Sequence, residues 1–260
     1  MERFRFVYTI TARGCYYLNV GVYLESVQVP KPVGDVGDCF PFTLPLYRNG
    51  LDLVFEKPVT VFAGENASGK STLLESLAVA CGFPRQGGTS ANIIRKTYGS
   101  DYSGNEVEIE PDNLELAKYM RLTWRTRTRR GYFLRAEYMT DTLAQHSMSD
   151  KYLSCSHGEG ILEIAGDFFK DGLFILDEPE TALSPTSQLA LLGLIDRNVK
   201  MFNAQYIIVT HSPILMGIPG SDFGWIENGA FSRMSYTECP HFQITKAFCN
   251  NPKRFIEQLK

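Results

Sequence analysis

A glycine loop between an apolar strand and an apolar helix most constrains how this chain can fold. The stretch "VTVFAGENASGKSTLLESLAVACGF" occupies residues 59–83. Val59, Val61 and Phe62 predict a short buried strand. Residues 64–71 fit G-x-x-x-x-G-K-[ST], a loop whose backbone N–H groups can surround a phosphate chain. The helix expected next would point its positive N-terminal end at those phosphates.

The loop therefore predicts nucleotide binding. Lys70 is expected to reach the β- and γ-phosphates, with its stem at the loop surface, and the Ser71 hydroxyl to hold Mg²⁺. The alternative is a chance match in a glycine-rich turn, and the strand before and helix after the loop argue against it. The candidate nucleotide-binding residues are Gly64, Glu65, Asn66, Ala67, Ser68, Gly69, Lys70, Ser71 and Thr72.

Two carboxylates follow a second apolar run, in "LFILDEPETALSP". Residues 173–176 predict a strand that delivers Asp177 and Glu178 at its C-terminal end. Asp177 can hold Mg²⁺, directly or through water, and Glu178 can polarise the water that attacks the γ-phosphate. The alternative is a strand ending in a charged turn. The glycine loop upstream favours the functional interpretation.

A third motif, "CSHGEGILEIAGDFF", has two interpretations. Ser156 and Glu159 have the spacing of a capping box that opens an amphipathic helix. The same serine, the Gly158 amide and the helix end could instead bind a phosphate. Local chemistry leaves both interpretations open.

Together these motifs resemble those of ATP-binding cassette (ABC) ATPases. "GENASGKS" resembles the Walker A loop, "LFILDE" resembles Walker B, and "SHGE" resembles the signature motif, with His157 where most signatures carry glycine. "YIIVTH" resembles the strand that ends in the switch histidine, here His211. Ser184 stands near the position of the transporters' D-loop aspartate.

The segments "DEPETALSP" and "THSPILMGIPG" point to a subtype. They are similar to the soluble ABC ATPases of the recombination-repair, chromosome-maintenance and overcoming-lysogenization-defect groups. "FLRAE" and the tail "HFQITKAFCNNPKRFIEQL" resemble small prokaryotic single-cassette ATPases. Within the wider class, Glu137 falls near the usual Q-loop glutamine.

The resemblance implies an ATPase with ATP and Mg²⁺ as ligands. It makes Glu178 and His211 catalytic, residues 64–72 ATP-binding, and Ser71 and Asp177 the metal ligands. In such ATPases the nucleotide lies between two cassettes, so the signature residues would contact the ATP of a partner chain. Those residues are Ser156, His157, Gly158 and Glu159. An ATP-dependent homodimer is therefore expected, acting as a switch for an unknown partner in a DNA-linked or phage-defence role.

The expected fold is an α/β cassette in which helices flank a mostly parallel sheet, with an N-terminal antiparallel β part. Residues 1–260 would form a single domain, with a helical and β insertion at about 84–165 between Walker A and the signature. The expected elements are two antiparallel strands within 1–30, strand-like pieces at 120–129 and 132–136, a polar helical region at 138–152, helices at 159–169 and 185–198, and strands at 173–176 and 206–209.

Composition excludes several classes of protein. A net charge of −3 gives no global attraction to nucleic acid or membrane. No stretch approaches the roughly 18 apolar residues of a membrane span, and "MERFRFVYTI" lacks the pattern of a signal peptide, so a cytoplasmic protein is expected. The six cysteines lack a C-x-x-C pair and the four histidines lack metal spacing. Buried free thiols are therefore expected instead of zinc or disulfides.

Two other functions stay open. A transporter's soluble ATPase subunit is disfavoured by "DEPET" and "THSP". A nucleic-acid-binding module with ATPase activity is suggested by Arg121–Arg135, where six arginines are interleaved with Trp124 and Tyr132. An exposed antiparallel hairpin with a solvated basic face is the alternative there. Three aromatic residues are candidates for stacking on adenine or for packing: Phe40, Phe42 and Tyr47.

Overall fold

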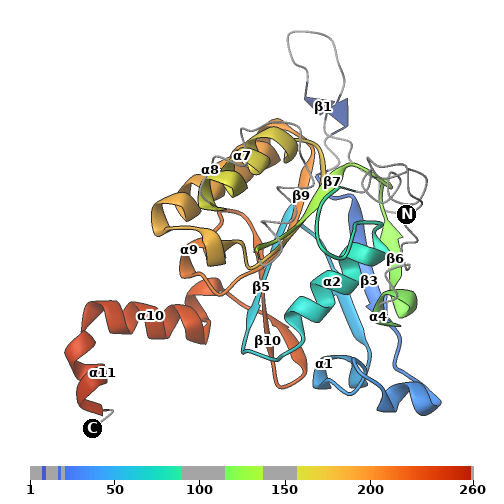
Figure 1. The fold of residues 1–260 in the computed structure, drawn as a ribbon, viewed down its shortest axis with the longest axis horizontal. Helices are drawn as coiled ribbons and strands as arrows, with labels where there is room; N and C mark the ends of the chain where they lie inside the picture. The colour runs from blue at the N-terminus through green and yellow to red at the C-terminus, as the bar shows by residue number, and fades with distance from the viewer. Residues whose placement is uncertain (1–7, 10–16, 19–20, 90–114, 137–156, 259–260) are drawn as a thin grey trace, which may run out of the picture.

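A six-stranded, mostly parallel sheet forms the centre of the computed structural model, which describes residues 8–9, 17–18, 21–89, 115–136 and 157–258 (Figure 1). Its strand order is β11-β10-β5-β9-β8-β7, and every neighbouring pair is parallel except β10 with β11. The strands are β5 (Val59–Gly64), β7 (Gly131–Arg135), β8 (Gly172–Asp177), β9 (Ala204–Val209), β10 (Asp222–Glu227) and β11 (Ala230–Arg233). The predicted α/β fold is confirmed.

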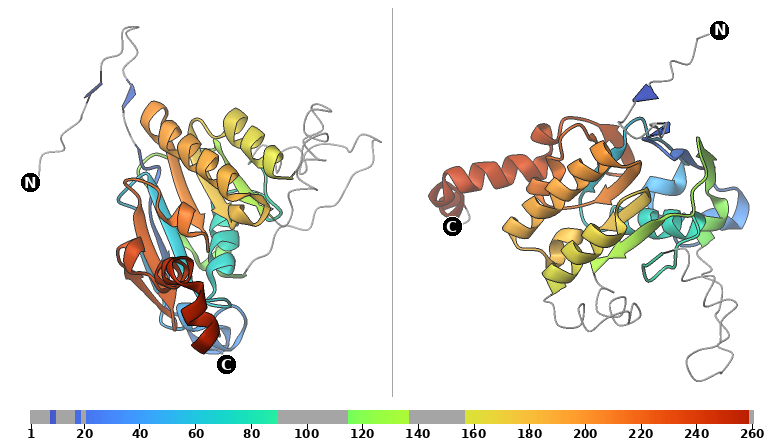
Figure 2. Two further views of the ribbon diagram at one scale, coloured as in Figure 1. Left: turned by 90° about the vertical axis from the view of Figure 1, so that its left-hand side faces the viewer. Right: turned by 90° about the horizontal axis from the view of Figure 1, so that it is seen from above.

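Helices cover one face of this sheet and a second sheet lies beyond the other. Strands β5, β8 and β9 are buried along their whole length, as expected for parallel strands covered on both faces. One core packs α7 (His157–Phe168), α8 (Pro185–Met201) and α9 (Pro213–Met216) against the sheet. The opposite core contains α2 (Lys70–Ala80) and the antiparallel sheet, and Figures 1 and 2 show both layers.

The antiparallel sheet has the order β4-β3-β6 and is tied to the centre by one buried glutamine. Its strands are β3 (Leu24–Val29), β4 (Leu51–Val54) and β6 (Arg121–Trp124). Gln205 of β9 accepts hydrogen bonds from the N–H groups of Tyr23 and Leu24 and donates one to the Leu24 carbonyl. A further pair, β1 (Tyr8–Thr9) and β2 (Tyr17–Leu18), is also antiparallel, so the expected N-terminal antiparallel part is confirmed.

Two helices at the C-terminal side extend away from the sheets as an arm (Figure 1). These are α10 (Pro240–Asn250) and α11 (Pro252–Gln258), and no residue from Pro240 to Glu257 is buried. Within the described ranges, the remaining α-helices are the short α1 (Pro45–Arg48) and α4 (Glu115–Tyr119), and three 3-10 helices occur at Gly34–Asp38, Pro179–Ala182 and Tyr236–Glu238. No helix in the described ranges is long and apolar enough to cross a membrane.

The hairpin expected within Arg121–Arg135 is wrong. Strand β6 ends at Trp124 and pairs with β3 in the antiparallel sheet, whereas β7 pairs with β8 in the central sheet. The two strands are therefore consecutive in sequence but belong to different sheets, because each finds its hydrogen-bonding partner elsewhere in the chain. The predicted strand at 120–129 is also too long, while the helical region expected at 138–152 lies outside the described residues.

The cysteines agree only partly with the prediction. Cys39, Cys81, Cys239 and Cys249 are free thiols, as expected. Cys239 is buried and Cys81 is intermediate, but Cys39 and Cys249 are exposed, so general burial of the thiols was a wrong expectation. Each exposed cysteine stands next to an exposed phenylalanine, Phe40 at 67% and Phe248 at 46%. The other two cysteines fall outside the described residues.

Candidate functional site

The phosphate loop runs from the end of β5 to the start of α2 at the C-terminal edge of the parallel strands. Gly64 is needed at the close β5–β10 contact, since a Cβ there would lie 2.1 Å from the Ile226 carbonyl oxygen. Gly69 has a φ of +94°, a conformation that favours glycine. A cavity of about 260 Å³ opens above the loop. It is lined by Phe40, Leu44, Asn66, Ala67, Ser68, Gly69, Lys70, Ser71, Thr72, Glu178 and His211.

Lys70 is buried, with 4% of its surface exposed, so the expectation of a stem at the loop surface is wrong. Its Nζ donates to the carbonyl oxygens of Gly64 at 2.9 Å and Glu65 at 2.6 Å, and lies 3.3 Å from Ser68 Oγ. Desolvation lowers the pKa of Lys70, while the nearby carboxylates, Glu178 foremost, act in the opposite direction. The backbone and the Ser68 hydroxyl of the loop thus surround the Lys70 ammonium group and hold it in place.

Tyr47 supports the loop from below, a role that sequence reasoning missed. Its hydroxyl donates to the Gly69 carbonyl at 2.7 Å, and burial raises the pKa of this phenol. Tyr47 and Phe42 are 0% and 1% exposed, so packing explains both and neither can stack on a ligand. Phe40 is 67% exposed and lines the cavity, so of the three aromatic residues it is the one whose ring is accessible for stacking on adenine.

The ends of β8 and β9 bring the two predicted catalytic residues together. Glu178 has a φ of +47°, a left-handed conformation that is costly for a non-glycine residue and recurs at functional sites. Its N–H donates to the Val209 carbonyl at 2.9 Å, which fixes this turn against β9. Glu178 Oε1 then lies 3.4 Å from His211 Nε2. Desolvation foremost, followed by Lys70, lowers the pKa of His211 and favours a neutral imidazole.

Glu180 links the same two strand ends and was not predicted as a site residue. Its Oε1 accepts a hydrogen bond from the His211 N–H at 2.5 Å. Burial raises the pKa of the Glu180 carboxyl, although its hydrogen bonds oppose the shift. The "DEPET" segment signalled a subtype of protein but gave no indication of this contact, because the partner comes from a different strand.

Asp177 lies at the end of β8, is 7% exposed, and has a buried cation beside it. Strand register places Arg135 opposite Asp177, and Arg135 Nε lies 3.8 Å from Asp177 Oδ2. The other end of the guanidinium reaches Glu75 Oε1 of α2 at 2.8 Å. Arg135 therefore joins the phosphate-loop helix to the strand that carries Asp177.

The signature residues are only partly within the described chain. Ser156 and Glu137 lie outside it, so the capping box and the Q-loop position stay predictions. His157, Gly158 and Glu159 form the first turn of α7. Among the described residues that line the loop cavity, none comes from α7.

Carboxylates lie beside several arginines of the Arg121–Arg135 segment. Arg125 pairs with Glu25 at 3.2 Å and Arg130 with Asp171 at 2.5 Å, while Arg135 is buried. Their carboxylate partners neutralise half of the six arginines. The electrostatic basis for a nucleic-acid surface here is correspondingly reduced.

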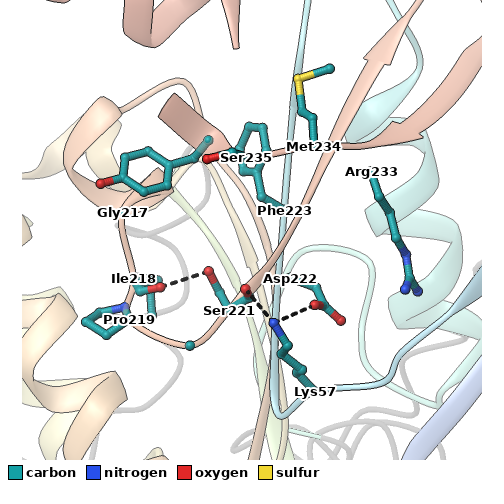
Figure 3. A pocket seen from close by; sticks show the side chains of 12 residues that line it. Lys57, Gly217, Ile218, Pro219, Ser221, Asp222, Phe223, Arg233, Met234 and Ser235 are labelled. Atoms are coloured by element: carbon teal, nitrogen blue, oxygen red, sulfur yellow. Dashed lines mark hydrogen bonds and ion pairs between the residues drawn. The ribbon is translucent and has the colours of Figure 1, made fainter. Parts of the chain in front are cut away.

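A second cavity, of about 430 Å³, lies at the start of β10 (Figure 3). Lys57 contacts Asp222 Oδ1 at 2.9 Å and the Ser221 carbonyl at 3.3 Å in its wall. None of the predicted site residues lines this cavity. In the described ranges, no three His, Cys, Asp or Glu side chains are grouped so that they could hold a metal by themselves.

Comparison with known proteins places the chain in a family. A family model described as an AAA domain matches residues 42–177, just over half of the chain. Among curated proteins, none matches this chain.

Several solved structures are similar to the chain at low identity. The SMC head domain from Thermotoga maritima is 12% identical, with a TM-score of 0.44 over 82% of this chain and 98% of that one. A cbiO1 structure from Clostridium perfringens, part of the ABC transporter complex cbiONQ, is 18% identical, with a TM-score of 0.44 over 91% and 99%. A dimeric, post-hydrolysis ATP-binding cassette bound to ADP and Pi is 13% identical, with a TM-score of 0.39 over 82% and 98%.

Proposed function

Because the chain belongs to the AAA domain family of P-loop ATPases, we propose that it binds Mg-ATP in the loop cavity and hydrolyses it. One observation carries the proposal: Lys70, Glu178 and His211, from three separate elements, meet around a single cavity above the phosphate loop. The order of motifs along neighbouring parallel strands agrees with the ABC type of P-loop ATPase.

Each of the three residues has a distinct task in this proposal. The Lys70 ammonium exchanges loop carbonyls for oxygens of the β- and γ-phosphates, and its burial strengthens that attraction. Glu178 orients the attacking water, and His211 donates a hydrogen bond to the γ-phosphate. The contact of 3.4 Å between the two side chains lets them act on the same region of the substrate.

Ser71 and Asp177 have the donor types that suit Mg²⁺. A hydroxyl and a carboxylate provide oxygen ligands, and Mg²⁺ in nucleotide sites takes its remaining ligands from phosphates and water. The absence of a three-residue metal cluster in the described ranges is consistent with such a shared site. When bound, the ion would offset the charge that develops on the phosphates.

We further propose that two chains close around two ATP molecules, with α7 of each completing the site of the other. Residues of the same chain line the loop cavity, and its described lining includes none from α7. In this arrangement Ser156 caps its own helix and faces the partner's γ-phosphate. Residues 1–260 would act as one ATPase domain whose closure drives an unknown partner, in a DNA-linked or phage-defence process.

Nucleotide binding is tested with Lys70→Ala, matched by Lys57→Ala. Lys57 is 48% exposed at the second cavity, so its removal tests for general loss of positive charge. We expect Lys70→Ala to weaken Mg-ATP binding at least about a hundredfold in titration calorimetry, since a charge-assisted contact to phosphate is lost. Equal ATP affinity in both variants would remove Lys70 from the site.

Hydrolysis is tested with Glu178→Gln and His211→Ala. Positioning and electrostatic groups of this kind typically contribute about a hundredfold or more to the rate, so turnover should fall by that factor. ATP affinity should stay close to wild type, because Lys70 supplies the positive charge that holds the phosphates and is unchanged in both variants. Undiminished phosphate release from either variant would contradict the role given to that residue.

The trans arrangement is tested with Ser156→Arg in the Glu178→Gln background. Glu178→Gln protein should be monomeric without nucleotide and dimeric with Mg-ATP in multi-angle light scattering. Adding Ser156→Arg should abolish the dimer while ATP stays bound to the monomer. In otherwise wild-type chains, mixing Ser156→Arg with Lys70→Ala should restore at most one composite site. Normal hydrolysis by an ATP-bound Ser156→Arg monomer would refute the two-chain site.

A further inference from the structure

The first turn of α10 brings a second histidine to the hydrolysis site. The ring centroid of His241 lies 5.2 Å from that of His211, with the two planes inclined by 33°. His241 Nε2 also lies 3.6 Å from Oε1 of Glu65 in the phosphate loop. On a third side, the Trp225 ring meets His241 edge to face at 4.9 Å. His241 thus contacts the phosphate loop, the residue His211 after β9, and Trp225 of β10.

This turn is anchored to the element that follows His211 directly. Cys239 is fully buried, and its Sγ lies 3.7 Å from Met216 Sδ of α9 and accepts the Phe242 N–H at 3.4 Å. The rings of Phe242 and Tyr236 pack edge to face at 5.3 Å. Because α9 begins two residues after His211, the anchor fixes His241 and His211 relative to each other.

The rest of the arm lacks such an anchor within the described residues. Three apolar side chains of the arm are exposed: Ile244 at 59%, Phe248 at 46% and Ile256 at 53%. In Figure 1 the start of α10 lies against the rest of the molecule, and α10 and α11 then project away from it. Burial at this end is therefore concentrated around Cys239 and the ring of His241. The side chain of His241 is 21% exposed, although it stands on a helix that projects into solvent.

We propose that His241 is a positioning residue for ATP hydrolysis, which holds the His211 imidazole in its working orientation through the contact between the two rings. The inference rests on the hydrolysis proposed above. His211 is 29% exposed, so it would otherwise retain rotamer freedom. Its ring contacts both Glu178 and His241. A group held in this way needs little reorganisation in the transition state.

The contact is tested first without nucleotide, by NMR of the histidine rings. The His211 Hε1 resonance is assigned by its loss in His211→Ala. In His241→Ala it should shift and broaden, because a neighbouring ring current and a packing restraint are removed. His241→Phe keeps an aromatic ring in that place and should restore a sharp signal. An unchanged His211 resonance in His241→Ala would overturn the proposal.

Turnover then tests the consequence. We expect His241→Ala to lower kcat about tenfold while KM for ATP changes less than about twofold, since small displacements of a catalytic group cost rate more than binding. His241→Phe should recover most of that loss. Ile244→Ala, one turn further along the exposed helix, is the matched control and should match wild type. Wild-type kcat in His241→Ala, or no recovery in His241→Phe, would overturn the proposal.

A double-mutant cycle shows whether His241 acts through His211. Coupled residues give non-additive effects, so His241→Ala should cause no further loss of kcat in the His211→Ala background. Equal losses in both backgrounds would overturn the proposal. A wild-type protein without turnover would instead contradict the proposed function, and the NMR experiment would still report on the ring contact. Circular dichroism confirms that each variant is folded.

Discussion

Replacing Arg135 by Met should destabilise the protein far more than removing an ordinary surface arginine. The Arg135 side chain is 9% exposed and bridges Glu75, 15% exposed, and Asp177, 8% exposed. Methionine fills similar volume but leaves two carboxylates in a low-dielectric environment without this cation. Removing one partner of a buried ion pair costs about 3–5 kcal/mol.

The structure places the expected cost at the lower end of that range. Glu75 also contacts Arg85 at 3.3 Å, so one carboxylate keeps a cation after the substitution. We therefore expect a loss of about 3 kcal/mol in the free energy of unfolding. For a chain of this size that corresponds to a fall in Tm of about 6–12 °C.

The measurement is urea unfolding of the nucleotide-free protein, followed by circular dichroism and tryptophan fluorescence. Arg130→Met is the matched control, because Arg130 pairs with Asp171 at 2.5 Å but is 76% exposed. Exposed pairs contribute only about 0–1 kcal/mol, so this variant should unfold close to wild type. Equal shifts of the unfolding midpoint in the two variants would refute the reasoning that the Arg135 contacts contribute more to the free energy of unfolding because they are buried.

Two substitutions and one chemical modification test the surroundings of the site. Tyr47→Phe removes one buried hydrogen bond to the loop backbone and should cost about 1–3 kcal/mol of unfolding free energy and weaken ATP binding, as measured by urea unfolding and calorimetry. Gly64→Ala should disrupt the β5–β10 contact at Ile226 and lower Tm sharply; an unshifted melting curve would contradict the close approach. Burial raises the pKa of the Cys239 thiol, so at pH 8 iodoacetamide should modify it far more slowly than Cys249, as peptide mass spectrometry would show; equal rates would disprove its burial.

Local pattern alone predicted the chemistry at the ends of the strands. Three groups lie where short apolar segments end: the loop before α2, the carboxylates Asp177 and Glu178 at the end of β8, and His211 after β9. In each case the composition of the segment predicts the strand and where it ends. Parallel strands present their carboxyl ends at one edge of a sheet, so the convergence of these segments was also predictable. The mostly parallel order followed from the alternation of helix and strand along the chain.

Tertiary structure alone decided which side chains surround those segments. The support of the loop by Tyr47 and the pairing of Arg135 with Asp177 both depend on partners distant in sequence. The same holds for β6 and β7, which adjoin in the chain but enter different sheets, and for His241, whose solvent-exposed helix carried no sign of a site. A sequence pattern reports how a segment meets its immediate neighbours, whereas packing selects among many distant partners by the total burial and hydrogen bonding of the whole fold.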